Sequence, residues 1–297
     1  MTQPAPTWIA DATSLADFRK NPEAFRLKHR LHLVPAAPDD KMRAGSAVHA
    51  ALNVWFTIRD ADAAVAQVAA FYAATGGAAI ARPQSYVERV VRAYATRYPR
   101  ALDPFTVLST EQYVEGDIAY AGGAFRYCGI EDRVVEFADG SVYVMDTKTT
   151  GLYVNSAWLD TLSLSDQMTG YVALRRARGL RCDGFLVDAI HFNDRTQNVD
   201  AAKDFLRYGP VRVEDWRVER WAADVAYTLA QIRALDDTRG ATVPWPLYQN
   251  WSYGKVDGYR EFYVTPPELH ASTAKLFEVR AWEPRSVAEA RAAGVGE

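Results

Sequence analysis

The 297-residue sequence predicts an α/β fold in which a mixed central β-sheet is flanked by helices, with helical additions at the N-terminal and C-terminal ends. Three observations predict this class. Helical periodicity fills residues 1–100, β-branched residues with glycine breaks run from Phe105 to Lys148, and helical and strand patterns alternate afterwards. With 49% hydrophobic residues the chain can bury a large core, so we expect a single domain over residues 1–297.

Residues 1–100 make up the helical N-terminal part. A helix is expected to begin at a Ser14 cap in SLADFRKNPEAFRLKHR, and a second follows a glycine in GSAVHAALNVWFTI. An alanine-rich third helix covers Ala61 to Ala74, and PQSYVERVVRAYATRY predicts a fourth with Pro83 in its first turn.

Residues 101–212 make up the sheet core. Between Phe105 and Lys148 the sequence predicts an antiparallel meander with breaks at Gly116, Gly122–Gly123 and Gly140. A helix from about Ser165 to Arg178 follows, and CDGFLVDAIHF and DFLRYGPVRV predict two more strands.

Residues 213–297 are helical and rich in aromatic side chains. A long helix is expected over roughly Val213 to Leu235, and another begins near Pro267.

Composition excludes several classes of protein. No stretch of eighteen uninterrupted apolar residues is present, and the start MTQPAPTWIADATS lacks a basic region followed by an apolar run, so we expect neither a membrane span nor a signal peptide. Cys128 and Cys182 are far apart without a CxxC pattern, which argues against a disulfide framework and a cysteine-built metal site. A cytoplasmic protein is the default expectation.

The segment GIEDRVVEFADGSVYVMDTKTTG reads as two strands around a turn, and the turn type decides which side chains meet. A two-residue turn at Asp139–Gly140 pairs Asp132 with Thr147 and sends the two aspartates to opposite faces. A three-residue loop with Gly140 in the left-handed position pairs Asp132 with Asp146 instead.

In the second register, two carboxylates face each other and repel unless a cation lies between them. Mg²⁺ or Mn²⁺ meets this need, because these ions take oxygen ligands and leave positions for water and phosphate. Lys148 would lie beside the ion, where its charge can stabilise a phosphorane or activate a water. The alternative is that Asp132 with Arg133, and Asp146 with Lys148, are ordinary ion pairs at strand ends.

These residues resemble the core of the PD-(D/E)XK nuclease superfamily, in the variant of RecB-like exonucleases, where G-x-x-D-R leads into D-x-K-T. GSAVHAAL resembles the family's histidine helix through Gly45 and His49, and DQMTGYVAL resembles its Q-x-x-x-Y motif through Gln167 and Tyr171. STEQYVEG places Glu111 where some members carry a glutamate near the metal, although an exposed strand glutamate is the alternative. The resemblance runs from about Ser14 to Leu174 and implies a restriction-endonuclease-like catalytic core.

The resemblance implies a role for each motif residue. Asp132 and Asp146 would hold one or two Mg²⁺ or Mn²⁺ ions, with His49, Glu111 and the carbonyl of Thr147 completing the shell. Lys148 would activate the water, while Gln167 and Tyr171 would shape the site and hold the strand.

The chain departs from the family at the cysteines of its iron–sulfur members. Asn21, before Pro22, stands where those members have cysteine, and Trp245 to Val264 contains none, so we expect no iron–sulfur cluster. Aromatic residues crowd that segment instead, and they either pack in a core or stack on single-stranded bases. These are Trp245, Tyr248, Trp251, Tyr253, Tyr259, Phe262 and Tyr263.

The net charge of −3 gives no global attraction to nucleic acid, so local patches must hold DNA. Two basic stretches are candidates, with solvated helix faces as the alternative. They supply Arg19 and Lys20, and Arg175, Arg176 and Arg178. We therefore expect a metal-dependent DNA nuclease, an exonuclease rather than an endonuclease, acting in recombination, repair or phage DNA metabolism with a possible partner protein. The alternatives are a catalytically silent DNA-binding scaffold and, last, another phosphate-handling hydrolase.

Overall fold

The computed structural model describes residues 9–35, 40–74, 82–248 and 256–292. The chain divides into two compact units, each assembled from separate stretches. The first comprises residues 1–38, 117–127 and 219–283, and the second comprises 39–116, 128–218 and 284–297. The three consecutive parts expected from the sequence stay a prediction.

Most of a five-stranded sheet lies in the second unit, in the order β2-β3-β4-β5-β6. β3 and β4 are antiparallel, β4 and β5 are parallel, and β5 and β6 are antiparallel, so the predicted mixed sheet is confirmed. The parallel pair needs a crossover, which the helices between β4 and β5 provide. The strands are β2 (Phe105–Tyr120), β3 (Gly123–Phe137), β4 (Val142–Thr150), β5 (Gly184–His191) and β6 (Phe205–Arg212).

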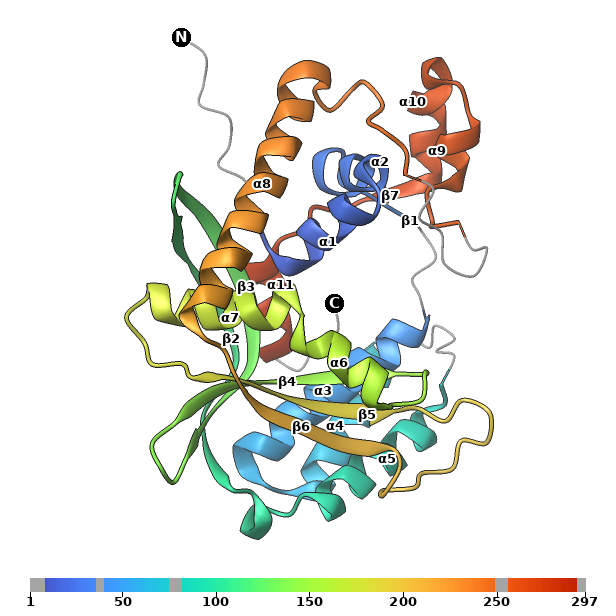
Figure 1. Ribbon diagram of the computed structural model, residues 1–297. Helices are drawn as coiled ribbons and strands as arrows, with labels where there is room; N and C mark the ends of the chain where they lie inside the picture. The colour runs from blue at the N-terminus through green and yellow to red at the C-terminus, as the bar shows by residue number, and fades with distance from the viewer. Residues whose placement is uncertain (1–8, 36–39, 75–81, 249–255, 293–297) are drawn as a thin grey trace. The chain divides into compact units, whose positions relative to one another are not determined.

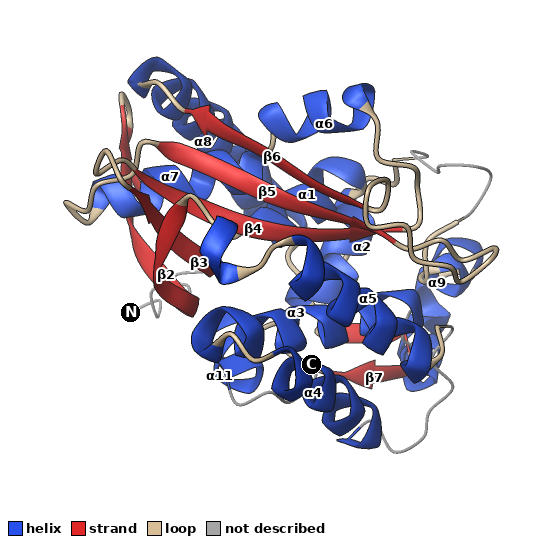
Figure 2. Ribbon diagram, turned by 90° about the horizontal axis from the view of Figure 1, so that it is seen from below, coloured by secondary structure: helices blue, strands red, loops and turns tan. Residues whose placement is uncertain are grey.

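Helices cover both faces of this sheet (Figures 1 and 2). α3 (Asp40–Ile58), α4 (Ala61–Ala74) and α5 (Gln84–Arg97) lie on one face, and α6 (Ser156–Ser163) and α7 (Asp166–Ala177) lie on the other. Successive strand residues point to opposite faces. Tyr143 and Met145 accordingly join the α3–α5 core, whereas Val144 joins the core under α6 and α7. Burial on both faces explains why β4 begins as an uninterrupted apolar run.

The turn between β3 and β4 is the three-residue loop that the metal-site hypothesis requires. The Phe137 N–H donates to the Ser141 carbonyl at 2.9 Å, and Gly140 has φ +77°. The register pairs Glu136 with Val142 and continues to Arg133 with Met145. The predicted register is therefore confirmed, and one further step along it sets Asp132 against Asp146.

The first unit contains short helices, most of the long helix α8 and a small two-stranded sheet. β1 (Leu33–Pro35) pairs antiparallel with β7 (Phe277–Val279). The helices are α1 (Ala12–Lys20), α2 (Pro22–Phe25), a π-helix at Arg26–Arg30, α8 (Asp215–Arg239), α9 (Arg260–Val264) and α10 (His270–Thr273). Single 3₁₀ turns lie at Arg100–Leu102, Pro267–Leu269 and Ala274–Leu276, and α11 (Pro284–Ala292) belongs to the second unit. No helix in the described ranges is long and apolar enough to cross a membrane.

Several element boundaries differ from the prediction. α1 is capped by Asp11, whose Oδ1 accepts from the Ser14 N–H at 3.0 Å, so Ser14 completes a capping box instead of opening the helix. α3 begins at Asp40, ahead of Gly45, and Pro83 is the N-cap of α5 rather than part of its first turn. α6 was not predicted.

Asn21 is the centre of a buried hydrogen-bond network in the first unit. Its Nδ2 donates to Asp257 at 3.2 Å and to the Tyr263 hydroxyl at 3.0 Å, and its Oδ1 accepts from the Tyr248 N–H at 3.4 Å. These bonds connect the start of α2 to a segment more than two hundred residues away. Trp245, Tyr259 and Phe262 are buried beside it, which favours packing for those three, whereas Trp251 and Tyr253 lie outside the described residues.

Candidate metal centre

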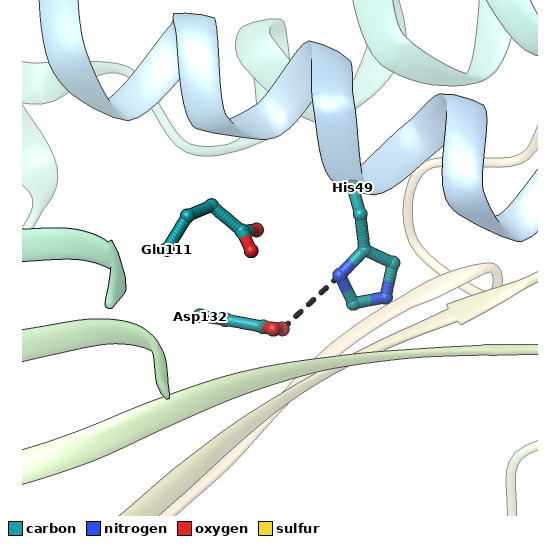
Figure 3. A group of neighbouring side chains, drawn as sticks. All are labelled: His49, Glu111 and Asp132. Carbon is teal, nitrogen blue, oxygen red and sulfur yellow. Dashed lines mark ion pairs between the residues drawn. The ribbon is translucent and has the colours of Figure 1, made fainter. Parts of the chain in front are cut away.

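Three side chains from three elements of the second unit lie close together (Figure 3). His49 comes from α3, Glu111 from β2 and Asp132 from β3, and one ligand atom of each lies within 4.8 Å of the others. His49 Nδ1 lies 3.2 Å from Asp132 Oδ2. An imidazole nitrogen and two carboxylate oxygens form a donor set that suits a divalent cation.

Glu111 is held in an unusual backbone conformation. It has φ +45°, in the left-handed region, and its side chain is buried. A non-glycine residue costs about 1–2 kcal/mol there, and such strain concentrates at functional sites. The alternative of an exposed strand glutamate is therefore wrong, since Glu111 is buried next to His49 and Asp132.

Asp132 connects the centre to β4. The Thr147 backbone N–H donates to Asp132 Oδ2 at 2.8 Å, so this oxygen contacts both β4 and the imidazole of His49 on α3. The backbone of Thr147 is therefore within reach of the centre, while the Thr147 side chain points to the other face and contacts Arg133.

Asp146 and Lys148 form an ion pair beside this group. Lys148 Nζ lies 2.7 Å from Asp146 Oδ2 and donates to Gln167 Oε1 at 2.7 Å. Gln167 Nε2 in turn donates to the Tyr171 hydroxyl at 2.7 Å. The two residues of the Q-x-x-x-Y motif thus fix the ammonium group of Lys148, because the amide of Gln167 can satisfy both neighbours in only one orientation.

The pKa of Asp146 is raised above its ordinary value. Burial is the largest cause, and the negative charge of Asp132 adds to it, while Lys148 and His49 act in the opposite direction. A raised pKa means that burial, and then the charge of Asp132, disfavour the ionised form of Asp146. A divalent cation would remove that penalty.

Two motif glycines allow close approach around the site. A Cβ at Gly129 would lie 2.5 Å from Cε1 of Tyr171. The Tyr171 ring can therefore pack this closely on β3 only because position 129 is glycine. A Cβ at Gly45 would lie 2.7 Å from Thr149 Oγ1, so glycine also admits α3 against β4. The G-x-x-D and G-x-x-x-H spacings therefore have a packing cause.

The predicted DNA-contacting arginines have different surroundings. Arg175 forms an ion pair with the fully buried Glu131 at 3.0 Å, and Arg176 donates to the carbonyls of Cys182 and Val213 and pairs with Asp215. These contacts give both side chains a structural role. Arg178 is exposed.

In the first unit, Arg19 Nε donates to Thr228 Oγ1 at 3.1 Å, and Lys20 is exposed at the end of α1. Nucleic-acid contact by these residues stays a prediction.

Two buried charges next to Asp132 were missed as site residues. Glu131 and Arg133 flank it, and each is 1% exposed. Three consecutive charges in a strand that is buried on both faces were the available signal, since each such charge needs a partner in the interior.

The family comparison agrees with this geometry. The model of the PD-(D/E)XK nuclease superfamily matches residues 12–242, and the chain belongs to this superfamily of metal-dependent nucleases. No curated protein matches the chain. The crystal structure of SSO0001 matches with 18% sequence identity and a TM-score of 0.28, over 41% of this chain. The chain spans about half of the length of that protein (49%).

Replacing Gly129 by alanine should disturb the hydrogen bonds that hold Lys148. The added methyl group collides with the buried ring of Tyr171, so we expect a loss of about 1–3 kcal/mol in the free energy of unfolding and a lower cleavage rate. Urea unfolding and a nuclease assay measure the two effects. Gly116→Ala is the control, because its Cβ would meet Leu174 at an ordinary 3.6 Å. An unchanged Gly129→Ala protein would contradict this role of the glycine.

The raised pKa of Asp146 predicts that metal binding strengthens as pH rises. The folded pKa exceeds the unfolded one, so the contribution of Asp146 to the stability of the metal-free chain is complete below about pH 3.9 and is lost as pH rises through the raised value. Mn²⁺ competes with the proton for the carboxylate. The increase in unfolding temperature caused by Mn²⁺ should therefore grow with pH across this window, and less so in Asp146→Asn. An increase of the same size at every pH would show that Asp146 does not take part.

Proposed function

We propose that this chain is a Mg²⁺- or Mn²⁺-dependent deoxyribonuclease, and more specifically an exonuclease that acts on DNA ends or single strands. The convergence of His49, Glu111 and Asp132 beside the Asp146–Lys148 ion pair is the observation that carries the proposal. The exonuclease assignment rests on the resemblance of the hairpin to RecB-like exonucleases.

The proposed ligands are His49, Glu111 and Asp132, with Asp146 and the Thr147 carbonyl completing the set. A bound divalent cation would supply positive charge for the scissile phosphate and the leaving oxygen. The donor set fits such an ion because it combines hard oxygens with one imidazole. Its three carboxylates are almost fully buried, with 6% exposure for Glu111, 3% for Asp132 and 1% for Asp146. Buried carboxylates this close to one another repel, and a divalent cation between them would relieve that repulsion.

Lys148 is the proposed catalytic cation. Its side chain is 30% exposed, so the ammonium group can reach a water and a phosphate while Asp146 and Gln167 fix its position. It would orient the attacking water and stabilise negative charge that develops on the phosphate. Tyr171 holds Gln167 in the orientation that accepts the hydrogen bond from Lys148.

Strand guidance is assigned to the exposed residues Arg178 and Lys20 and to the half-buried Arg19. Arg178 lies just beyond α7, the helix that carries Gln167 and Tyr171, and is the proposed phosphate contact in the second unit. Arg19 and Lys20 are the corresponding proposal for the first unit. The proposed setting is DNA recombination, repair or phage DNA metabolism, in the cytoplasm of a bacterium or a phage-infected host, with a possible partner protein.

Cleavage of end-labelled DNA tests the proposal directly. With Mn²⁺, the wild-type protein should release nucleotides from linear single-stranded or double-stranded DNA and leave circular DNA intact. Lys148→Ala should lower the rate about a hundredfold or more, because it removes the positive charge that stabilises the negative charge developing on the phosphate. Lys203→Ala is the control, since Lys203 is 70% exposed and pairs with the surface residue Asp200.

The same assay separates the enzyme from a silent scaffold. Asp146→Ala should still bind DNA but no longer cleave it. If the wild type and Asp146→Ala both bind DNA and neither cleaves it, the scaffold is favoured. Cleavage of circular DNA by the wild type would show that the enzyme is an endonuclease and not an exonuclease.

A further inference from the structure

Three consecutive residues of β3, Glu131, Asp132 and Arg133, are charged and buried. Asp132 lies in the candidate metal centre. Glu131 pairs with Arg175 of α7, the helix that carries Gln167 and Tyr171. Arg133 differs from both, because no carboxylate in the described ranges forms an ion pair with it.

The partners of Arg133 are a hydroxyl group and an aromatic ring. Its Nη2 donates to Thr147 Oγ1 on β4, and its guanidinium carbon lies 4.4 Å from the centre of the Phe56 ring on α3. Its Nε has no hydrogen-bond partner. Burying a charged group with so few polar contacts costs several kcal/mol. A contribution to stability therefore does not explain why Arg133 is an arginine.

The nearby carboxylate on the same sheet face is already satisfied. Asp188 is the β5 partner of Thr147 in the sheet register, and it accepts from the Tyr94 hydroxyl. Arg207 pairs with Asp188 at 2.7 Å and with Asp103 at 2.8 Å. A row of polar side chains thus crosses the sheet behind the metal centre, and Arg133 joins it through Thr147 rather than through a charge.

Both contacts of Arg133 lead back to the metal centre. Thr147, which accepts from its guanidinium, donates its own N–H to Asp132. Phe56 lies on the same helix as His49, seven residues further on, which is about two turns and therefore the same side of α3. The guanidinium of Arg133 therefore contacts both β4, which supplies the Thr147 backbone, and α3, which supplies His49.

We propose that Arg133 is a positioning residue for metal binding. Its guanidinium holds β4 and α3 against β3, so that the Thr147 backbone, His49 and Asp132 meet at the distances that a divalent ion requires. This role rests on the metal site proposed above, and Arg133 itself touches neither ion nor substrate. Residues that orient metal ligands from behind typically contribute about 10- to 100-fold in metal affinity.

Titration with Mn²⁺, followed by the electron paramagnetic resonance signal of the free ion, tests this role without any need for turnover. Arg133→Met should weaken Mn²⁺ binding about tenfold or more. Arg133→Lys should also bind more weakly than wild type, because lysine lacks the planar group that stacks on Phe56 and reaches Thr147.

Arg26→Met is the matched control. Arg26 is also 1% exposed, but it belongs to the first unit, where it bonds to Glu23 and to the Ala241 carbonyl. This variant should lose thermal stability yet bind Mn²⁺ within about twofold of wild type, since it leaves the metal ligands untouched.

The outcomes separate the two proposals. Wild-type affinity in either folded Arg133 variant overturns the positioning role, and so does an equal loss of affinity in Arg26→Met. If neither Arg133 variant folds while Arg26→Met does, Arg133 serves global stability and the positioning role fails. If the wild-type protein binds no Mn²⁺, the proposed metal site itself fails.

Discussion

The antiparallel pairing of β3 with β4 is the constraint on which the site depends. The left-handed Gly140 closes a three-residue loop, and the resulting register aligns Arg133 with Met145 and sets Asp132 against Asp146. Because side chains alternate along a strand, a shift of one residue would send Asp132 to the opposite face. The hydrogen bond from the Thr147 N–H to Asp132, and every contact behind it, would be lost with that shift.

Several buried charged side chains around this pairing each have a polar or oppositely charged partner. Glu131 has Arg175, Asp146 has Lys148, and Arg133 has the hydroxyl of Thr147. The group of His49, Glu111 and Asp132 is different, since it gathers two buried carboxylates and one imidazole with a ligand atom of each within 4.8 Å of the others. Such a group is costly in the absence of a cation, and the strained backbone of Glu111 adds to that cost. Both features are understandable if metal binding is the function of the group.

Local patterns were sufficient to predict the mixed sheet and the bounds of α4 at Ala61–Ala74, because strand alternation and helical period are encoded in neighbouring positions. They left two turns open at Gly140, and only the metal-site hypothesis required the three-residue loop that the structure has. The partners of Arg175 and Arg176 could not be predicted in this way, since Glu131 lies on another strand and a basic helix end looks the same whether it faces solvent or a buried acid. The same holds for Arg133, whose ring partner Phe56 is far away in the sequence. The left-handed backbone of Glu111 has no signal in the residue types, because glutamate does not favour it.

Diffraction from crystals soaked in Mn²⁺, recorded at a wavelength where manganese scatters anomalously, tests the central claim most directly. The account predicts an anomalous peak among the imidazole of His49 and the carboxylates of Glu111 and Asp132, with Asp146 beside it. A saturating soak that leaves this position without a peak, while the three side chains keep their arrangement, would contradict the assignment of the group as a metal centre.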